Sequence, residues 1–345
     1  MTVLIVRHGA GRGRAQEGML APVERVARDA PAVRAGLRFH ETGSGAGPPL
    51  DGVRAVVFWL ADPLRELYPD CFAEASALEA HARERGLVLV NPPSALSNSI
   101  KSTQARLWEE AGVPSAACFP FADRAGLEDV LARAPYPLLL KGDLMHAQDR
   151  MHFCRSAKDG LRLPDARIGY PGVATSFVDT RAGWAAREPE SLFARYYHKK
   201  RLFVFGRELQ PRHVFFSKSP IVGLGTSHLR RYLPRPGRAS RPGLLGLRRV
   251  EREMLAADWA YFEAPCEAPD VLAHAARSLG FGYAALDYAT RADGSVVVWE
   301  ANPYPFVPGP GQYALPVERR FEERFAAFCR GLGDLFARLL DGEKD

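Results

Sequence analysis

The chain has 345 residues, of which 47% are hydrophobic and 25% charged, a balance typical of a soluble globular protein with two or three packed lobes. No apolar run is long enough to cross a bilayer, and the opening residues, MTVLIVRHG, predict a β-strand rather than a signal peptide. The net charge of +6 comes mainly from arginine, because only seven lysines occur, and it does not by itself indicate nucleic-acid binding.

The cysteines exclude two classes of small stabilised fold. The five are far apart, odd in number and without a CxxC pair, which indicates neither a disulfide framework nor a zinc site. We therefore expect a protein of the reducing cytoplasm.

The first part of the chain alternates short apolar strands with helices. The predicted strands are 3–6, 54–60 and 87–91, and the predicted helices are 19–30 and 70–85. A Gly/Pro-rich loop, TGSGAGPPLDG, lies between the first two strands. This alternation predicts a parallel sheet with helices on its faces, and hence an α/β domain over residues 1–92.

A second domain is predicted over residues 93–174. Its first helix is capped by Ser97 or Ser99 and runs to Glu110, with Gly112 and Pro114 beyond its end. A second helix over 124–134 is followed by the apolar strand PYPLLLK.

The third predicted domain covers residues 175–345. The predicted strands are 175–180, 201–206, 208–216, 283–289 and 295–303, and the predicted helices are 267–279 and 317–340. Residues 223–249 contain seven arginines and many Gly and Pro residues, and are predicted to form a mobile loop. The amphipathic helix over 317–340 would present an apolar face that allows a homodimer.

Three oxygen-bearing side chains are brought together by the predicted hairpin YAALDYATRADGSVVVWEANP. Glu300 and Asn302 are two residues apart, so they face the same side of their strand, and pairing around the tight turn at Gly294 places Asp287 opposite them. Hard oxygen ligands of this kind suit Mg²⁺ bound to nucleotide phosphates. The alternative, that all three are solvated or turn residues, is disfavoured because an unpaired carboxylate is costly inside an apolar strand pair.

Two lysines lie where they can neutralise phosphate. Lys141 ends its apolar strand, a position from which a side chain enters a cleft, and Lys101 is near the start of the helix that follows NPPSALSNS. Either one alone is equally well explained as a surface lysine.

These motifs together resemble the ATP-grasp superfamily, which includes D-alanine–D-alanine ligase and glutathione synthetase. The shared order over residues 90–310 is N-P-x8-K, a helix ending in E-A-G-V-P, a strand ending in lysine, an extended strand near 175–180, and D-x12-E-x-N-P. The resemblance implies the ATP-grasp fold, in which two lobes hold ATP, preceded by an N-terminal parallel-sheet domain.

The resemblance also assigns roles to individual residues. It implies that Lys101 and Lys141 contact phosphates and that Asp287, Glu300 and Asn302 hold Mg²⁺, with Mn²⁺ as a substitute. It implies that the backbone of Ser176, Phe177 and Val178 pairs with adenine at the hinge and that Asp179 accepts a ribose hydroxyl. A basic residue of HKKRLFVFGRELQPRH would approach the transferred phosphate, and the candidates in order are Arg212, Arg201, Lys199 and Lys200.

One segment departs from the pattern. Many relatives carry a glycine-rich loop soon after the strand lysine, whose backbone N–H groups close over the phosphates. Here the segment reads GDLMHAQDRMHFC, with one glycine and with His146, Gln148, Asp149, Arg150 and His152 instead. We expect the phosphates to be closed off differently, by Arg150 or His146, or the activity to be altered.

The resemblance implies an ATP-dependent carboxylate–amine ligase that acts on an amino acid, a peptide or a similar small acid through an acyl phosphate. Alternatives are an ATP-grasp kinase and a non-catalytic nucleotide-binding protein. The arginines of 223–249 could instead contact an anionic substrate or nucleic acid, but they lack interleaved aromatic residues apart from Tyr232, so we do not expect nucleic-acid binding.

A different enzyme class is suggested by the first strand. Arg7-His8-Gly9 directly follows it, as in the motif of the histidine phosphatases, whose histidine attacks phosphate. Three residues are an unspecific signal, and the downstream motifs favour the ATP-grasp interpretation.

Overall fold

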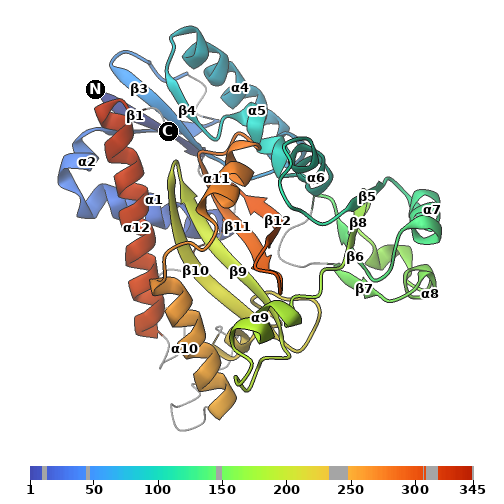
Figure 1. Cartoon of the computed structure of the whole chain (residues 1–345). Helices are drawn as coiled ribbons and strands as arrows, with labels where there is room; N and C mark the ends of the chain where they lie inside the picture. The colour runs from blue at the N-terminus through green and yellow to red at the C-terminus, as the bar shows by residue number, and fades with distance from the viewer. Residues whose placement is uncertain are drawn as a thin grey trace.

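The computed structural model describes residues 1–9, 14–43, 47–144, 150–232, 248–305, 307 and 318–343. Three four-stranded sheets organise this part of the chain. The sheet that contains the hairpin of residues 283–302 carries the predicted metal ligands. Figure 1 shows the three sheets with their helices, and the sheet formed within residues 118–176 projects at the right of the molecule.

The N-terminal sheet is entirely parallel, as predicted, in the order β2-β1-β3-β4. Its strands are β1 (Thr2–His8), β2 (Leu37–Thr42), β3 (Val53–Trp59) and β4 (Val88–Val90). Its helices are α1 (Arg14–Asp29), α2 (Pro31–Ala35), α3 (Leu64–Leu67) and α4 (Pro69–Glu84). The apolar side of α4 covers one sheet face, and α1 covers the other.

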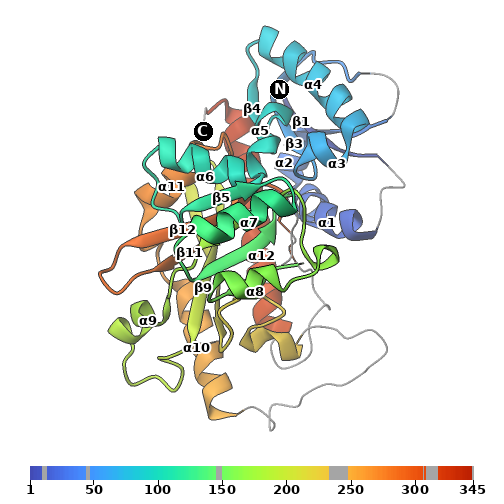
Figure 2. The same cartoon turned by 90° about the vertical axis from the view of Figure 1, so that its right-hand side faces the viewer.

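The small central lobe is an antiparallel sheet in the order β5-β8-β6-β7, with helices on one face (Figure 2). Its elements are β5 (Cys118–Phe121), α7 (Arg124–Arg133), β6 (Leu138–Gly142), β7 (His152–Cys154), α8 (Ala157–Leu161), η2 (Asp165–Arg167) and β8 (Gly172–Ser176). Its separate core includes Leu127, Leu131 and Leu138.

The large sheet is also antiparallel, in the order β10-β9-β11-β12. Its strands are β9 (Tyr197–Phe205), β10 (Glu208–Ser217), β11 (Tyr283–Thr290) and β12 (Val296–Asn302). The surrounding helices are α5 (Pro93–Leu96), η1 (Ser97–Ser99), α6 (Lys101–Glu110), α9 (Arg181–Arg187), η3 (His228–Tyr232), α10 (Arg249–Glu263), α11 (Pro269–Arg277) and α12 (Glu318–Asp341). Trp108 of α6 is buried with α11 against this sheet rather than in the core of the small lobe.

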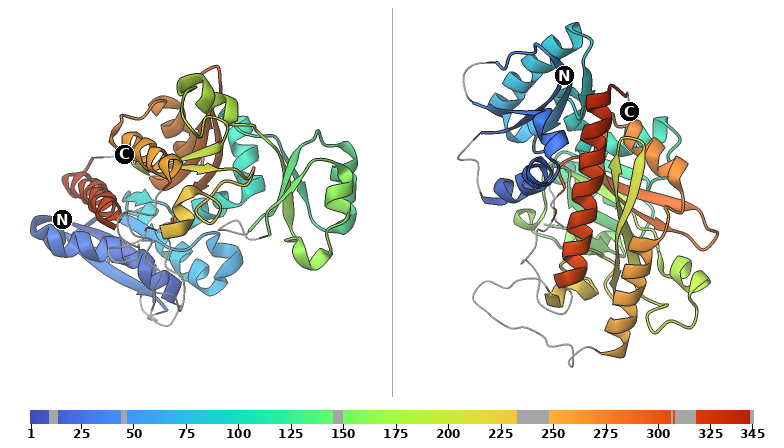
Figure 3. Two further views of the ribbon diagram at one scale, coloured as in Figure 1. Left: turned by 90° about the horizontal axis from the view of Figure 1, so that it is seen from below. Right: turned by 90° about the vertical axis from the view of Figure 1, so that its left-hand side faces the viewer.

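Helix α12 packs against both the N-terminal sheet and the large sheet. Its apolar side, which includes Phe328, Leu332 and Phe336, is buried between α1, the N-terminal sheet and the large sheet, and Figure 3 shows the helix running between them. The apolar face that we expected to allow a homodimer is therefore used inside the chain.

Several predicted boundaries need correction. The strand predicted over 175–180 is in fact β8, which begins at Gly172 and ends at Ser176. Among the elements that were not predicted are β2, β5, β7, α8, α9 and α10. Helix α6 begins at Lys101 with Ile100 at the cap position, while Ser97 and Ser99 form the preceding 3-10 turn, so neither serine caps it. Of the arginine-rich loop, residues 233–247 lie outside the described residues.

Candidate functional site

The hairpin of β11 and β12 brings two predicted metal ligands face to face. Asp287 is paired directly with Glu300, and Asn302 is paired with Ala285. The Asp287 side chain is only 3% exposed and that of Glu300 is 28% exposed, so the pair lies at the border between core and solvent. The Asn302 side-chain oxygen accepts a hydrogen bond from the Tyr304 amide at 2.8 Å. This contact orients the Asn302 side chain at the end of β12.

The donor set fits a hard divalent cation, because it offers two carboxylates and one amide oxygen on neighbouring strands. Among the described residues there is no group of three or more His, Cys, Asp or Glu side chains that could hold a metal. The predicted set does not need one, since its third member is Asn302 and Mg²⁺ in nucleotide sites takes its other ligands from phosphate and water.

Two cations of β9 bind the Asp287 carboxylate. Lys199 Nζ donates to Oδ2 at 2.7 Å, and Arg201 donates through Nε at 2.6 Å and through Nη2 at 2.9 Å. Burial alone would raise the pKa of Asp287, but the charges of Arg201 and Lys199 outweigh it and hold that pKa well below its usual range. Asp287 is therefore ionised at neutral pH.

Two further cations surround Glu300. Lys101, at the first turn of α6, places Nζ 3.9 Å from Glu300 Oε1. Lys141 lies in β6, where desolvation lowers the pKa of its ammonium group, the charge of Glu300 raises it, and the charges of Lys101 and Lys199 lower it further. Lysines predicted from two distant segments thus act on the same carboxylate.

The basic residues of β9 divide between the two sheet faces. Lys200 points away from Asp287: its Nζ contacts Glu267 Oε1 at 2.5 Å and Thr290 Oγ1 at 3.0 Å, and its side chain is 3% exposed. The structure therefore brings Lys199 and Arg201 to the predicted metal site and leaves Lys200 outside it, as strand alternation requires.

Arg212, the first candidate for contact with the transferred phosphate, is 2% exposed. It lies at an irregularity of β10, and its guanidinium carbon is 5.7 Å from the ring centre of Phe203, which is two residues from Arg201 on β9. Its role in catalysis stays a prediction.

The predicted hinge begins at Ser176, the last residue of β8. The Ser176 amide donates to Ala117 O at 2.9 Å and the Phe177 amide to Pro137 O at 3.0 Å, so both N–H groups are already used. The N–H of Val178 donates to no described backbone carbonyl and is the better candidate for the adenine edge. The carboxylate of Asp179 is held by Arg181 at 2.6 Å, a contact with which a ribose hydroxyl would have to compete.

The segment after Lys141 is anchored by a carboxylate. Asp143 accepts from the Ser102 amide at 2.8 Å and from the Ser102 hydroxyl at 2.6 Å, which ties the end of β6 to the start of α6. This link was not predicted from the sequence, because it joins residues 41 apart. Residues 145–149, which include His146, Gln148 and Asp149, lie outside the described residues.

The two remaining polar residues of that segment contact η2 and its neighbour. Arg150 donates to Ile168 O at 3.4 Å, and His152 Nε2 lies 2.8 Å from Arg167 O. Contact of Arg150 with the phosphates stays a prediction.

His8 does not have the environment of a nucleophile. Its Nε2 accepts a hydrogen bond from the Ala61 amide at 2.8 Å, its Nδ1 lies 3.6 Å from the Cys71 sulfur, and the side chain is 4% exposed. Because a nucleophilic histidine needs an accessible ring nitrogen, this packing disfavours the histidine phosphatase interpretation.

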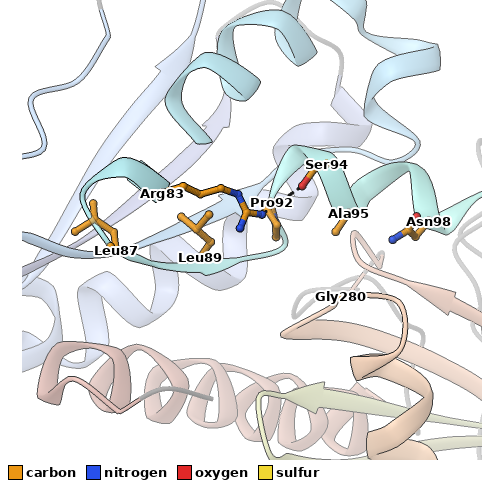
Figure 4. Close-up of a pocket in the computed structure, with 9 residues that line it drawn as sticks. Arg83, Leu87, Leu89, Pro92, Ser94, Ala95, Asn98 and Gly280 are labelled. Carbon is orange, nitrogen blue, oxygen red and sulfur yellow. Dashed lines mark hydrogen bonds between the residues drawn. The ribbon is translucent and has the colours of Figure 1, made fainter. Parts of the chain in front are cut away.

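An open groove lies elsewhere, beside the edge strand β4 (Figure 4). Leu87, Leu89 and Pro92 line one side and Gly280 the other, and the guanidinium of Arg83 is held by Glu79. The groove contains none of the predicted site residues.

Comparisons with known proteins identify the fold. No family model matches the sequence, and no curated protein matches it. Among solved structures, the ATP-grasp ligase PsnB complexed with a phosphomimetic variant of its minimal precursor, Mg and ADP is 16% identical with a TM-score of 0.54, covering 98% of this chain and 99% of PsnB.

Two other solved structures match this chain over 99% of their own lengths. D-cycloserine synthetase DcsG is 15% identical over 97% of this chain, with a TM-score of 0.54. D-alanine–D-alanine ligase from Bacillus anthracis complexed with ATP is 9% identical over 99% of this chain, with a TM-score of 0.52. The chain therefore has the ATP-grasp fold, as the resemblance in its sequence implied.

Proposed function

We propose that this chain is an ATP-dependent carboxylate–amine ligase that acts on an amino acid, a peptide or a similar small acid. The observation that carries the proposal is the cluster of four cations, Lys101, Lys141, Lys199 and Arg201, around the two carboxylates Asp287 and Glu300. Four positive and two negative groups leave an excess of two positive charges, which suits a triphosphate with its divalent cation.

The structural neighbours support the same proposal. The PsnB structure is a complex with Mg and ADP, and the D-alanine–D-alanine ligase structure is a complex with ATP. In this chain Asp287, Glu300 and Asn302 would hold the metal, and bound Mg²⁺ would supply charge stabilisation to the phosphates.

The reaction we propose has two steps. An oxygen of the substrate carboxylate attacks the γ-phosphorus of ATP, the bond to the bridging oxygen breaks, and ADP leaves. The amine nitrogen then attacks the carbonyl carbon of the acyl phosphate, the amide bond forms, the nitrogen loses a proton and inorganic phosphate departs.

The side chains of the cluster have a task in both steps. The phosphates are held by the four cations, which oppose the charge that gathers on the phosphate oxygens: Lys101, Lys141, Lys199 and Arg201. Arg212 lies on β10, the strand next to that of Lys199 and Arg201. No side-chain nucleophile is required.

Calorimetric titration with a non-hydrolysable ATP analogue, with and without Mg²⁺, tests the nucleotide site. We expect Mg²⁺-dependent binding that weakens about tenfold or more in Lys141→Met, because a hydrogen bond to a charged group contributes about 1.5–3 kcal/mol. Lys158→Met is the matched control, since Lys158 is an exposed lysine of α8 in the same lobe.

The products then distinguish the reaction types. ADP, phosphate and an amide formed from a paired acid and amine would support the ligase, whereas ADP with a stable phosphorylated product would identify a kinase. Binding without turnover of any acid would favour a non-catalytic nucleotide-binding protein. Absence of binding by folded wild type would refute the proposal.

A further inference from the structure

The side chain of Gln104, in the middle of α6, makes two hydrogen bonds to Ala301 of β12, the strand that carries Glu300 and Asn302. Gln104 Oε1 accepts from the Ala301 amide at 3.1 Å, and Gln104 Nε2 donates to Ala301 O at 2.5 Å. The same Nε2 donates to Ser99 O at 3.2 Å, and Gln104 is 1% exposed. Every polar atom of this amide therefore has a backbone partner.

Ala301 stands between the two predicted ligands of β12, Glu300 and Asn302. Since β12 is the last strand in the order β10-β9-β11-β12, the backbone groups on its outer side have no neighbouring strand among those described. Ala301 is 1% exposed, so its N–H and C=O also cannot turn to water, and a buried backbone group needs a partner. Gln104 provides both partners and takes the place of a neighbouring strand.

The rest of α6 is fixed independently of this contact. The Trp108 indole N–H, one turn further along, donates to Ala275 O of α11 at 2.9 Å. Three residues before Gln104, the Lys101 ammonium lies 3.9 Å from Glu300. The helix thus holds a phosphate-binding lysine and the strand that carries two metal ligands in one register.

We propose that Gln104 is a positioning residue for the divalent cation: it fixes the backbone between Glu300 and Asn302 and so sets the affinity of the site for the metal. This inference rests on the proposed function, because it takes those two side chains as ligands. Groups that orient metal ligands from outside the coordination sphere typically change metal affinity by about 10- to 100-fold when removed.

The test measures Mn²⁺ binding by electron paramagnetic resonance of the free ion, in the presence of a saturating non-hydrolysable ATP analogue. Gln104→Met keeps the side-chain length but removes all three hydrogen bonds, and we expect it to weaken Mn²⁺ binding about tenfold or more. Analogue binding without metal should stay as in wild type, because Lys101 and Lys141 are unchanged.

Two further variants separate positioning from a general loss of packing. Trp108→Phe keeps an aromatic ring in the same core but removes one buried hydrogen bond, which runs to α11 rather than to β12, so it should leave Mn²⁺ affinity unchanged. Gln104→Glu keeps an acceptor for the Ala301 amide but loses the donors to Ala301 O and Ser99 O, so it should weaken Mn²⁺ binding and remains available if Gln104→Met does not fold.

The outcomes are distinct. Wild-type Mn²⁺ affinity in a folded Gln104 variant, or an equal loss in Trp108→Phe, would overturn the inference while leaving the nucleotide site standing. Wild type that binds neither the analogue nor Mn²⁺ would overturn the proposed function itself.

Discussion

Lys199 and Lys200, two adjacent cations of β9, should respond to substitution in opposite ways. Lys200 is 3% exposed and is held by Glu267 and Thr290 on the sheet face away from Asp287. Lys200→Met removes one partner of a largely buried ion pair, a change that typically costs about 3–5 kcal/mol. We expect the lower end, about 3 kcal/mol, because Glu267 is 23% exposed and keeps its contact with Arg187.

Lys199→Met should show the reverse. Asp287 keeps two hydrogen bonds from Arg201, so the free energy of unfolding should fall by less than in Lys200→Met. The affinity for Mg·ATP should fall about ten- to hundredfold, because one charged contact to phosphate is lost, whereas Lys200→Met should leave it unchanged.

Urea unfolding followed by circular dichroism gives the stability of both variants, and calorimetric titration of the ATP analogue gives their affinity. The assignment of faces would be refuted if Lys200→Met lost nucleotide affinity at wild-type stability. It would also be refuted if Lys199→Met destabilised the fold without weakening nucleotide binding.

Two other predictions concern the structure around this sheet. Burial alone would raise the pKa of Glu267, but Lys200 and its other partners outweigh burial and lower the pKa from 4.5 to about 2. Its contribution is therefore complete above pH 4.5 and is lost as the pH falls towards 2. The resulting acid destabilisation, measured by urea unfolding, should be smaller in Lys200→Met, in which Glu267 keeps its contacts with Arg187 and Thr290. Gly183→Ala should destabilise by about 3 kcal/mol because its Cβ would lie 1.9 Å from Thr290 O, while Gly225→Ala, with no atom within 4 Å, should melt like wild type.

The sequence was most informative where one periodicity governs a short segment. Alternation along β12 and the tight turn that leads into it predicted that Asp287 would oppose Glu300, and the observed register confirms the pairing. The same alternation places Lys200 on the opposite face from Lys199 and Arg201. Grouping all three as candidates for phosphate contact was therefore wrong for Lys200, and the strand period already contained the signal that separates it.

The elements that were missed lack such a signal. The strand β2 (LRFHET) mixes apolar and polar residues because it is at the edge of the N-terminal sheet, and α10 directly follows the arginine-rich segment without a capping serine, threonine, asparagine or aspartate. The contact of Gln104 with Ala301 joins residues 197 apart, and no local pattern can predict a pairing of that kind.

The division of charge among rigid elements also explains why the glycine-poor segment after Lys141 need not prevent nucleotide binding. A glycine-rich loop supplies backbone N–H groups to phosphate, but here the cations come from the helix α6, the strand β6 and the strand β9. Each is fixed by partners of its own: Asp143 ties β6 to α6, Gln104 ties α6 to β12, and Asp287 holds the two cations of β9. A site preorganised in this way loses little conformational entropy on binding, so we infer that the affinity for the metal-bound nucleotide depends on these links rather than on the segment after Lys141.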